Sequence, residues 1–291
     1  MHAFLITAYQ DPEGLAGLVD DLGPAALVFI HYDRKARLSS TDEARLRRSP
    51  TVVHFSRRYK VNWGGHTHLK AILHLIRTAL EERSVQRLHL ITGSDRPIVP
   101  PAKFKAFFEQ RPASEFIQYF PLPTPYWKGG GIDRLTLYHP LDLFNAKDPI
   151  QKKLLDLTIH IQRRLGISRS MNGMPTLFGG STYWSLTREC LSYVMHRCDE
   201  RPEFLHRLRF THVPEEIFFQ SLIMDSPFAD NVVNDNLRYV DWNKRNGSTP
   251  AILDLTDLDR ILASGKLFAR KLQGPISKGL LNALRGTKDL T

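Results

Sequence analysis

The sequence has little cysteine and no long apolar run. Its only cysteines, Cys190 and Cys198, are too few for a disulfide scaffold or a tetrahedral zinc site. No stretch reaches the roughly 18 uninterrupted apolar residues of a spanning helix. The apolar start, residues 1–8, also lacks the basic start and cleavage site of a signal peptide. We therefore expect a cytoplasmic protein with reduced thiols.

Acidic residues are outnumbered by basic ones. The 40 Lys and Arg residues against 30 Asp and Glu give a net charge of +10, which favours anionic partners. One alternative function is therefore a protein that only binds nucleic acid or a membrane surface. It is not favoured, because the charge is spread along the chain and no helix-turn-helix, RNA-recognition or zinc-finger pattern occurs. The basic segments 151–165 and 271–288 are expected to contact an anionic membrane, which would make the protein peripheral to an inner membrane.

Strand and helix patterns alternate along the chain. Short apolar runs with β-branched or aromatic content predict strands at residues 3–7, 26–30, 51–55, 87–92, 115–120, 179–186 and 237–242. Apolar residues at helical spacing predict helices at 12–22, 66–82, 104–108, 148–165, 187–196, 214–224 and 255–263. The alternation over the first 120 residues predicts an α/β fold with a parallel sheet, in which ligand groups lie at the carboxyl ends of the strands.

Seven segments in order carry a resemblance to a known family. They are LITAYQDPEGL (5–15), FIHYDRK (29–35), RYKVNWGG (58–65), LHLITGSDRPI (88–98), FGGSTYWSLTRE (178–189), THVPEEIFFQSL (211–222) and LFARKL (267–272). Together they resemble the core-2/I-branching glycosyltransferases, which also include peptide O-xylosyltransferases, and the chain looks like a bacterial-type member. The resemblance implies a GT-A-like fold with a Rossmann-like mixed sheet flanked by helices. Residues 1–120 would form the nucleotide-sugar half and residues 121–291 the acceptor-binding and catalytic half of one continuous domain.

The resemblance also implies the reaction. The donor would be a UDP-sugar, with N-acetylglucosamine as the expected sugar and xylose as the alternative, and the acceptor a glycan hydroxyl. Transfer would invert the anomeric carbon without a divalent metal or another cofactor. In metal-dependent relatives an Asp-x-Asp motif lies where this chain has Asp95 followed by Arg96, and a single acid beside a cation disfavours a metal site. We place Asp95 on the donor side.

Inverting transfer needs a base for the acceptor hydroxyl and positive charge for the departing diphosphate. Glu216 matches the family's base, with Glu215 beside it on the acceptor side; alternatively, the pair only complements a helix dipole. Lys271 matches the family's diphosphate-binding lysine, and Arg270 is expected to share its role. The family's partner arginine is missing near position 248, and we choose Arg245 in its place.

The nucleotide contacts implied by the resemblance follow the first strands. Thr7 and Tyr9 end the first strand beside the uracil pocket, and Asp33 follows the second strand, where the matching acid binds uridine. Lys60 and Trp63 occupy a segment that approaches the nucleotide in the family. Trp63 is equally compatible with a place in the core.

Acceptor contacts are expected within and after the Pro-, Gly- and aromatic-rich loop 121–131. Asp133, Arg134 and Tyr138 occupy the region that the family uses for the acceptor, and Trp127 offers a flat face for a sugar. Trp184 is expected close to the cleft. For single aromatic residues, simple packing is the alternative.

Overall fold

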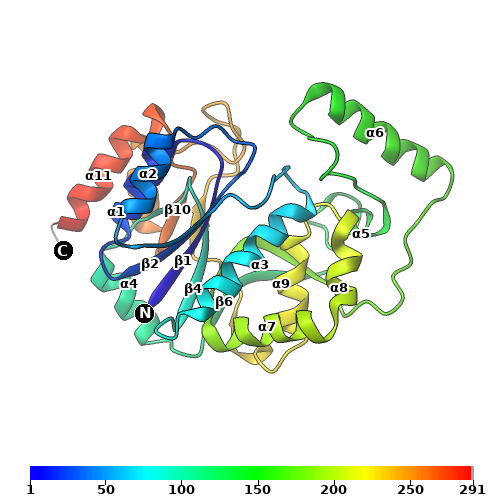
Figure 1. Ribbon diagram of the computed structural model, residues 1–291, viewed down its shortest axis with the longest axis horizontal. Helices are drawn as coiled ribbons and strands as arrows, with labels where there is room; N and C mark the ends of the chain where they lie inside the picture. Colours follow the sequence, from blue (N-terminus) through cyan, green and yellow to red (C-terminus); the bar gives the residue numbers. More distant parts are fainter. Residues whose placement is uncertain (290–291) are drawn as a thin grey trace.

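The computed structural model describes residues 1–289. Residues 290–291, which end the predicted second half, lie outside the described residues. The side chains from residue 288 on, including the last lysine of the predicted basic tail, lie outside them as well. A seven-stranded sheet in the order β3-β2-β1-β4-β7-β6-β8 is joined by a small sheet in the order β5-β10-β9 (Figure 1). The strands are β1 (His2–Ala8), β2 (Ala26–Tyr32), β3 (Val52–Ser56), β4 (Arg87–Thr92), β5 (Arg96–Pro97), β6 (Glu115–Pro121), β7 (Phe178–Thr187), β8 (Val232–Val233), β9 (Arg238–Val240) and β10 (Phe268–Arg270).

Helices cover both faces of the large sheet. They are α1 (Pro12–Asp21), α2 (Ser40–Arg48), α3 (His66–Glu81), α4 (Pro101–Glu109), α5 (Asp133–Thr136), α6 (Pro149–Arg164), α7 (Arg188–Glu200), α8 (Pro202–Arg207), α9 (Glu215–Met224), α10 (Leu258–Ala263) and α11 (Lys278–Asp289). In Figure 1, α1, α2 and α4 lie on one side of the sheet and α3, α7 and α9 on the other. Among the helices of residues 1–289, none combines the length and the apolar character needed to cross a bilayer.

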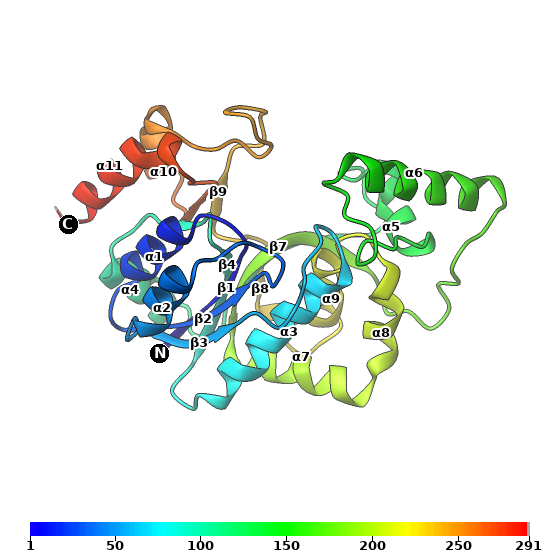
Figure 2. The ribbon, with the colours of Figure 1, turned by 45° about the horizontal axis from the view of Figure 1, so that its top comes forward.

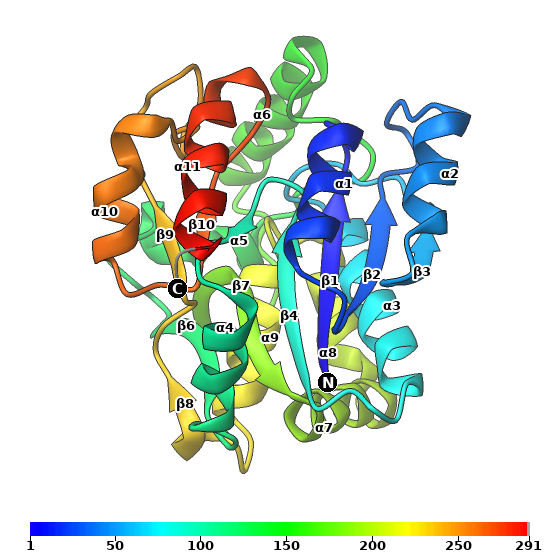
Figure 3. The same cartoon turned by 90° about the vertical axis from the view of Figure 1, so that its left-hand side faces the viewer.

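The register of the central strands brings their carboxyl ends together. β1 is parallel to both neighbours, and Thr7 near its end lies opposite His31 of β2 and Thr92 of β4. Figure 3 shows these strands running side by side. The polar loops that follow β1, β2 and β4 therefore meet at one edge of the sheet.

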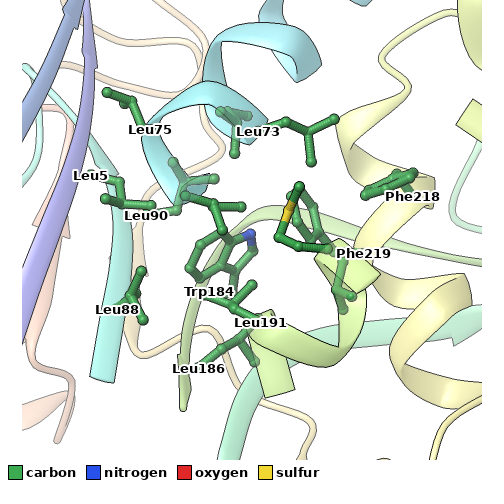
Figure 4. Packing of buried hydrophobic residues seen from close by; sticks show 14 of the residues in the cluster. Leu5, Leu73, Leu75, Leu88, Leu90, Trp184, Leu186, Leu191, Phe218 and Phe219 are labelled. Atoms are coloured by element: carbon green, nitrogen blue, oxygen red, sulfur yellow. The ribbon is translucent and has the colours of Figure 1, made fainter. Parts of the chain in front are cut away.

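Alternate residues of each strand pack on opposite faces. Leu5 of β1 joins the core beneath α3, α7 and α9, whereas Phe4 and Ile6 join the core beneath α1 and α4. Trp184 of β7 is fully buried in the first core, with its ring centroid 5.3 Å from that of Phe219 (Figure 4). Burying a large apolar side chain stabilises the fold by about 1.5–3 kcal/mol, so these faces hold the sheet and helices together.

Helix α6 lies apart from the two helical layers, at the end of an arm that leaves the body after α5 (Figures 1 and 2). Its start is fixed locally, because Pro149 occupies the first turn and the Asp148 carboxylate accepts the N–H groups of Ile150 and Gln151. Gly166, with φ of 66°, follows its end. The helix is therefore specified by its own caps more than by packing.

The α/β class with a mixed sheet between helices is confirmed. Strands β1 to β4 and β6, from the part of the chain where a parallel sheet was predicted, run in the same direction, and the sheet is mixed because β7 runs antiparallel to both β4 and β6. An apolar run indicates that a strand is buried but not its direction. The large sheet continues across residue 120, because β6 pairs with β7, and the division into two functional halves there stays a prediction.

Candidate active site

A chain of polar contacts ties the first turn of α9 to the end of β1. Nδ1 of His68, in the first turn of α3, lies 2.6 Å from Oε1 of Glu215, and its Nε2 lies 3.3 Å from Oγ1 of Thr7. Burial alone would lower the pKa of His68, but the charge and hydrogen bond of Glu215 together raise it. Glu215, predicted at the acceptor, is instead buried against His68, which the sequence did not single out.

Glu216 is the next residue of α9 and is partly open to solvent. Its Oε2 accepts a hydrogen bond from Nη1 of Arg134 at 2.8 Å. Burial raises the pKa of Glu216 to about 7, Arg134 opposes that rise, and the charge of Glu215 adds to it. The N-terminus of α9 and Arg134 both favour the charged form of Glu216. Burial and the charge of Glu215 outweigh these two effects, so the pKa is raised. A carboxylate that titrates near neutral pH suits a general base.

The backbone just before α9 is strained. Val213 has φ of 54°, a left-handed conformation that a β-branched residue rarely adopts and that costs on the order of 1–3 kcal/mol. Its N–H donates to the carbonyl oxygen of Gly64 at 2.8 Å. This contact holds the chain where it turns into Pro214 and the two glutamates, so their placement depends on the loop before α3.

Arg134 is held on two sides. Besides its bond to Glu216, its guanidinium lies 3.5 Å from the ring centroid of Trp127. A Cβ at Gly131 or Gly179 would come within 2.5 Å of the same indole, which explains why glycine occupies both positions. One face of Trp127 is thus covered by Arg134 and its edge by backbone, so Trp127 supports Arg134 and does not offer the open sugar platform expected from the sequence.

The other predicted acceptor residues lie at the base of the α6 arm. The Asp133 carboxylate forms an ion pair with Arg163 of α6. Tyr138 is exposed on one side and carries the Arg169 guanidinium 5.4 Å from its ring centroid. The Asp133 side chain thus links α5 to α6, and Tyr138 keeps an exposed face beside them.

On the donor side, Asp33 follows β2 and is nearly fully buried. Its Oδ1 accepts the N–H groups of Lys35 and Val61, each at 3.1 Å. These bonds fix the segment that carries Lys60 and Trp63, both of which are exposed. Asp33 therefore positions this segment, and Trp63 is on the surface and not in the core.

Three basic side chains gather beyond the end of β1. Nζ of Lys271 donates to Oγ of Ser248 at 3.0 Å, and its pKa is lowered by burial and then by the charges of Arg270 and Lys147. Nζ of Lys147 lies 4.5 Å from the ring centroid of Tyr9 and 3.4 Å from its hydroxyl. Among the described residues, no carboxylate pairs with Lys147 or Lys271. The charges of Arg270 and Lys147 disfavour the protonated form of Lys271, so an anion bound among these three side chains would be stabilised.

Asp95 lies behind this cluster and is fully buried. Its Oδ2 accepts the N–H and hydroxyl of Thr92 and lies 3.6 Å from Nη1 of Arg270, while its Oδ1 has no hydrogen-bond partner among the described residues. The expected donor contact is corrected, because a side chain with no exposed surface supports Arg270 instead. Arg270 also lies over the ring of Tyr183, 4.2 Å from its centroid.

Two further predictions are corrected. The Arg245 side chain is bound by the carboxylates of Asp257, Asp241 and Asp254, which raise its pKa. Lys271 instead contacts Ser248, so Arg245 is not the partner of Lys271 that the sequence predicted. Trp184 is fully buried in the core and does not reach the cleft. Within residues 1–289 there is no group of three or more His, Cys, Asp or Glu residues placed to hold a metal ion.

A carboxylate with a near-neutral pKa and a group of cations, two of them without a carboxylate partner among the described residues, lie beside the end of β1. This arrangement suits group transfer from an anionic donor. Comparison with known proteins agrees with that class. Residues 3–261 match the family model described as Core-2/I-Branching enzyme, and the chain belongs to this family. The mixed sheet of parallel strands with an antiparallel β7 agrees with the GT-A-like fold that the resemblance implied.

Several curated proteins are similar to this chain. Xylosyltransferase 1 of Homo sapiens is 25% identical over 275 residues, covering 88% of this chain and 27% of the relative. Beta-glucuronosyltransferase GlcAT14A of Arabidopsis thaliana is 23% identical over 256 residues, covering 84% of this chain and 54% of the relative. The chain thus spans about a quarter of the length of the xylosyltransferase. Among solved structures, the match to mouse xyloside xylosyltransferase 1 in its apo form spans 95% of this chain and 96% of that chain, with 11% identity. Its TM-score of 0.38 is too low to support an inference.

Proposed function

We propose that this chain is an inverting, metal-independent glycosyltransferase that moves a sugar from a UDP-sugar to a hydroxyl of a glycan. The observation that carries the proposal is Glu216, a carboxylate with a pKa of about 7 that Arg134 orients and solvent reaches. Membership of the Core-2/I-Branching family supports the same class of reaction. We take N-acetylglucosamine as the first candidate sugar.

In this mechanism Glu216 accepts the proton of the acceptor hydroxyl as its oxygen attacks the anomeric carbon. The bond from that carbon to the diphosphate oxygen breaks on the opposite face, so the configuration inverts and UDP leaves with the bonding electron pair. Arg134 keeps the Glu216 carboxylate aimed at the acceptor. Its charge also lowers the pKa of Glu216, which keeps part of the base ionised at neutral pH.

The leaving diphosphate would be met by Arg270, Lys271 and Lys147. Their positive charges would do the work that a divalent cation does in other sugar transferases, stabilising negative charge as the bond breaks. Lys147 was not among the residues predicted from the sequence, and its contact with Tyr9 and its charge near Lys271 support this role. It comes from the loop before α6, so it reaches the site from the opposite side to Lys271 and Arg270.

Calorimetric titration with UDP tests the donor site. We expect UDP to bind in EDTA, manganese to leave the affinity unchanged, and Lys271→Ala to weaken binding at least about tenfold, since a hydrogen bond to a charged group is worth about 1.5–3 kcal/mol. Lys278→Ala, which removes the same charge from exposed α11, is the matched control. Binding that requires manganese would refute the metal-independent mechanism, and no binding of UDP would refute the proposed donor.

Xylose is the second candidate sugar, because xylosyltransferases are among the similar proteins. A hydrolysis assay with UDP-N-acetylglucosamine, UDP-xylose and UDP-glucuronic acid measures which sugar is released. Glu216→Gln supplies the catalytically impaired control. A preference for UDP-xylose would replace the first candidate without changing the roles of Glu216 and Lys271.

A further inference from the structure

Helix α6 carries an exposed apolar stripe. Its members recur at intervals of three or four residues and lie on one side of the helix, each at least 44% exposed: Ile150, Leu154, Leu157, Ile161 and Leu165 just beyond the helix end. Burying apolar surface is favourable by about 25 cal/mol per Å², and an apolar side chain that stays in water forgoes this stabilisation. A continuous stripe of this length is therefore unusual on a surface without a partner.

The helix is anchored through a different face. Leu155 is buried, and the Gln162 side chain exchanges hydrogen bonds with the N–H and C=O of Tyr138. Leu155 and Gln162 lie roughly 80–140° around the helix from the centre of the stripe, given 100° per residue. Among the described residues, no element covers the stripe, and Figure 2 shows α6 standing clear of α3 and α9.

Two basic side chains lie along one border of the stripe. Lys153 and Arg164 are exposed and lie next to it by helical position, without a carboxylate partner among the described residues. Asp156, the only acid of the helix, lies farther round and pairs with Lys152 at 2.6 Å. An apolar stripe flanked by Lys and Arg, whose long stems let the charges reach phosphate groups, is the pattern of a helix that lies in a membrane interface.

We propose that α6 docks this protein on an anionic phospholipid surface, with the stripe among the acyl chains and Lys153 and Arg164 at the headgroups. The chain's net charge of +10 adds long-range attraction to such a surface. A second protein copy is a poorer occupant, because a stable interface takes about 20–30 residues on each side and the stripe offers five.

Co-sedimentation with vesicles tests the proposal. Wild-type protein should sediment with phosphatidylglycerol vesicles at low salt, much less with phosphatidylcholine vesicles, and less with either at high salt. Leu154→Ser with Leu157→Ser should lower the partition coefficient at least about tenfold. The matched control is Leu255→Ser with Leu262→Ser, two leucines of similar exposure elsewhere, which should bind as the wild type does.

The charges are tested in the same assay. Lys153→Gln with Arg164→Gln should weaken binding to anionic vesicles by about 30-fold at low salt, from roughly 1 kcal/mol for each basic residue. Lys103→Gln with Lys105→Gln, which removes the same charge from α4 on the far side of the body, should weaken it much less (Figure 1).

Three results would overturn the proposal: no binding to anionic vesicles, equal losses in the stripe and control variants, or a stripe variant that changes the oligomeric state but not vesicle binding. UDP titration of each variant separates this proposal from the proposed function. Vesicle binding without UDP binding would refute the function and leave the docking helix in place.

Discussion

The ion pair between Arg134 and Glu216 makes a prediction about the pH dependence of the reaction. As the proposed base, Glu216 must be ionised to accept a proton. With a pKa of about 7, half of it would be ionised at pH 7, and activity should fall below that pH. Arg134 opposes the raised pKa through a hydrogen bond of 2.8 Å. Replacing Arg134 with Gln should therefore raise the pKa of Glu216 and move the acid limb of the pH profile upward.

The size of the shift follows from the exposure of the pair. An opposite charge at this distance lowers a carboxyl pKa by about 1–3 units, and partial solvent screening places this pair near the lower end. A rise of about one unit, or ~1.4 kcal/mol, leaves about a tenth of Glu216 ionised at pH 7, so activity should fall about fivefold there. At about pH 9 most of the carboxyl is ionised in both proteins, and the difference should nearly vanish.

The assay is kcat/KM for sugar transfer or donor hydrolysis between about pH 5.5 and 9.5, which reports the pKa of the free enzyme's base. Arg134→Lys should keep most of the charge and shift the limb little. Arg163→Gln, which breaks the ion pair with Asp133 but leaves Glu216 untouched, should not shift it. If Arg134→Gln lowers activity by the same factor at every pH, the electrostatic reasoning is wrong and Arg134 is only a structural support.

Three other variants test the rest of the site and the core. Lys147→Ala should weaken UDP binding in calorimetry about fivefold, because one partly exposed charge leaves the cation cluster, whereas Lys152→Ala on the same arm should change nothing. His68→Gln should lower kcat at least about tenfold with little change in UDP affinity, because Glu215 loses its charged partner and the first turn of α9 shifts. Trp184→Ala should reduce the free energy of unfolding in urea by about 3–5 kcal/mol, since it empties a core position.

The fold was predictable wherever an element is long and its pattern is strong. The strand Arg87–Thr92 has the bounds expected from its apolar run, and α3 differs from the expected helix by one residue. Strand β10, Phe268–Arg270, was missed because three residues carry no periodicity. Helix α2 was missed because only Leu46 of its residues is buried, which leaves no apolar stripe to detect. Such elements are defined by the surface on which they pack, and that surface comes from distant parts of the chain.

The sequence predicted which polar and charged residue types lie near the ends of the strands, but not which residues each of them contacts. Arg245 is the nearest arginine in sequence to the missing position, but three carboxylates bind it, two of them from 254 and 257, and Ser248 itself contacts Lys271. Trp184 illustrates the period of a strand: adjacent residues face opposite sides, so Tyr183 lies under Arg270 while Trp184 enters the core. Lys147 had no local signal, because its partner Tyr9 lies 138 residues away.

The end of β1 contacts both the segment that carries the proposed base and one of the proposed diphosphate-binding cations, and the two contacts differ in strength. Thr7 is linked through His68 to the α9 turn that carries the base, by hydrogen bonds within a partly buried chain. Tyr9, two residues on, meets Lys147 only through an exposed cation–π contact and a long hydrogen bond. An exposed contact of this kind is worth roughly 0.5–1 kcal/mol and is easily broken. The proposed base is thus tied to the sheet more firmly than Lys147, one of the cations proposed to meet the diphosphate.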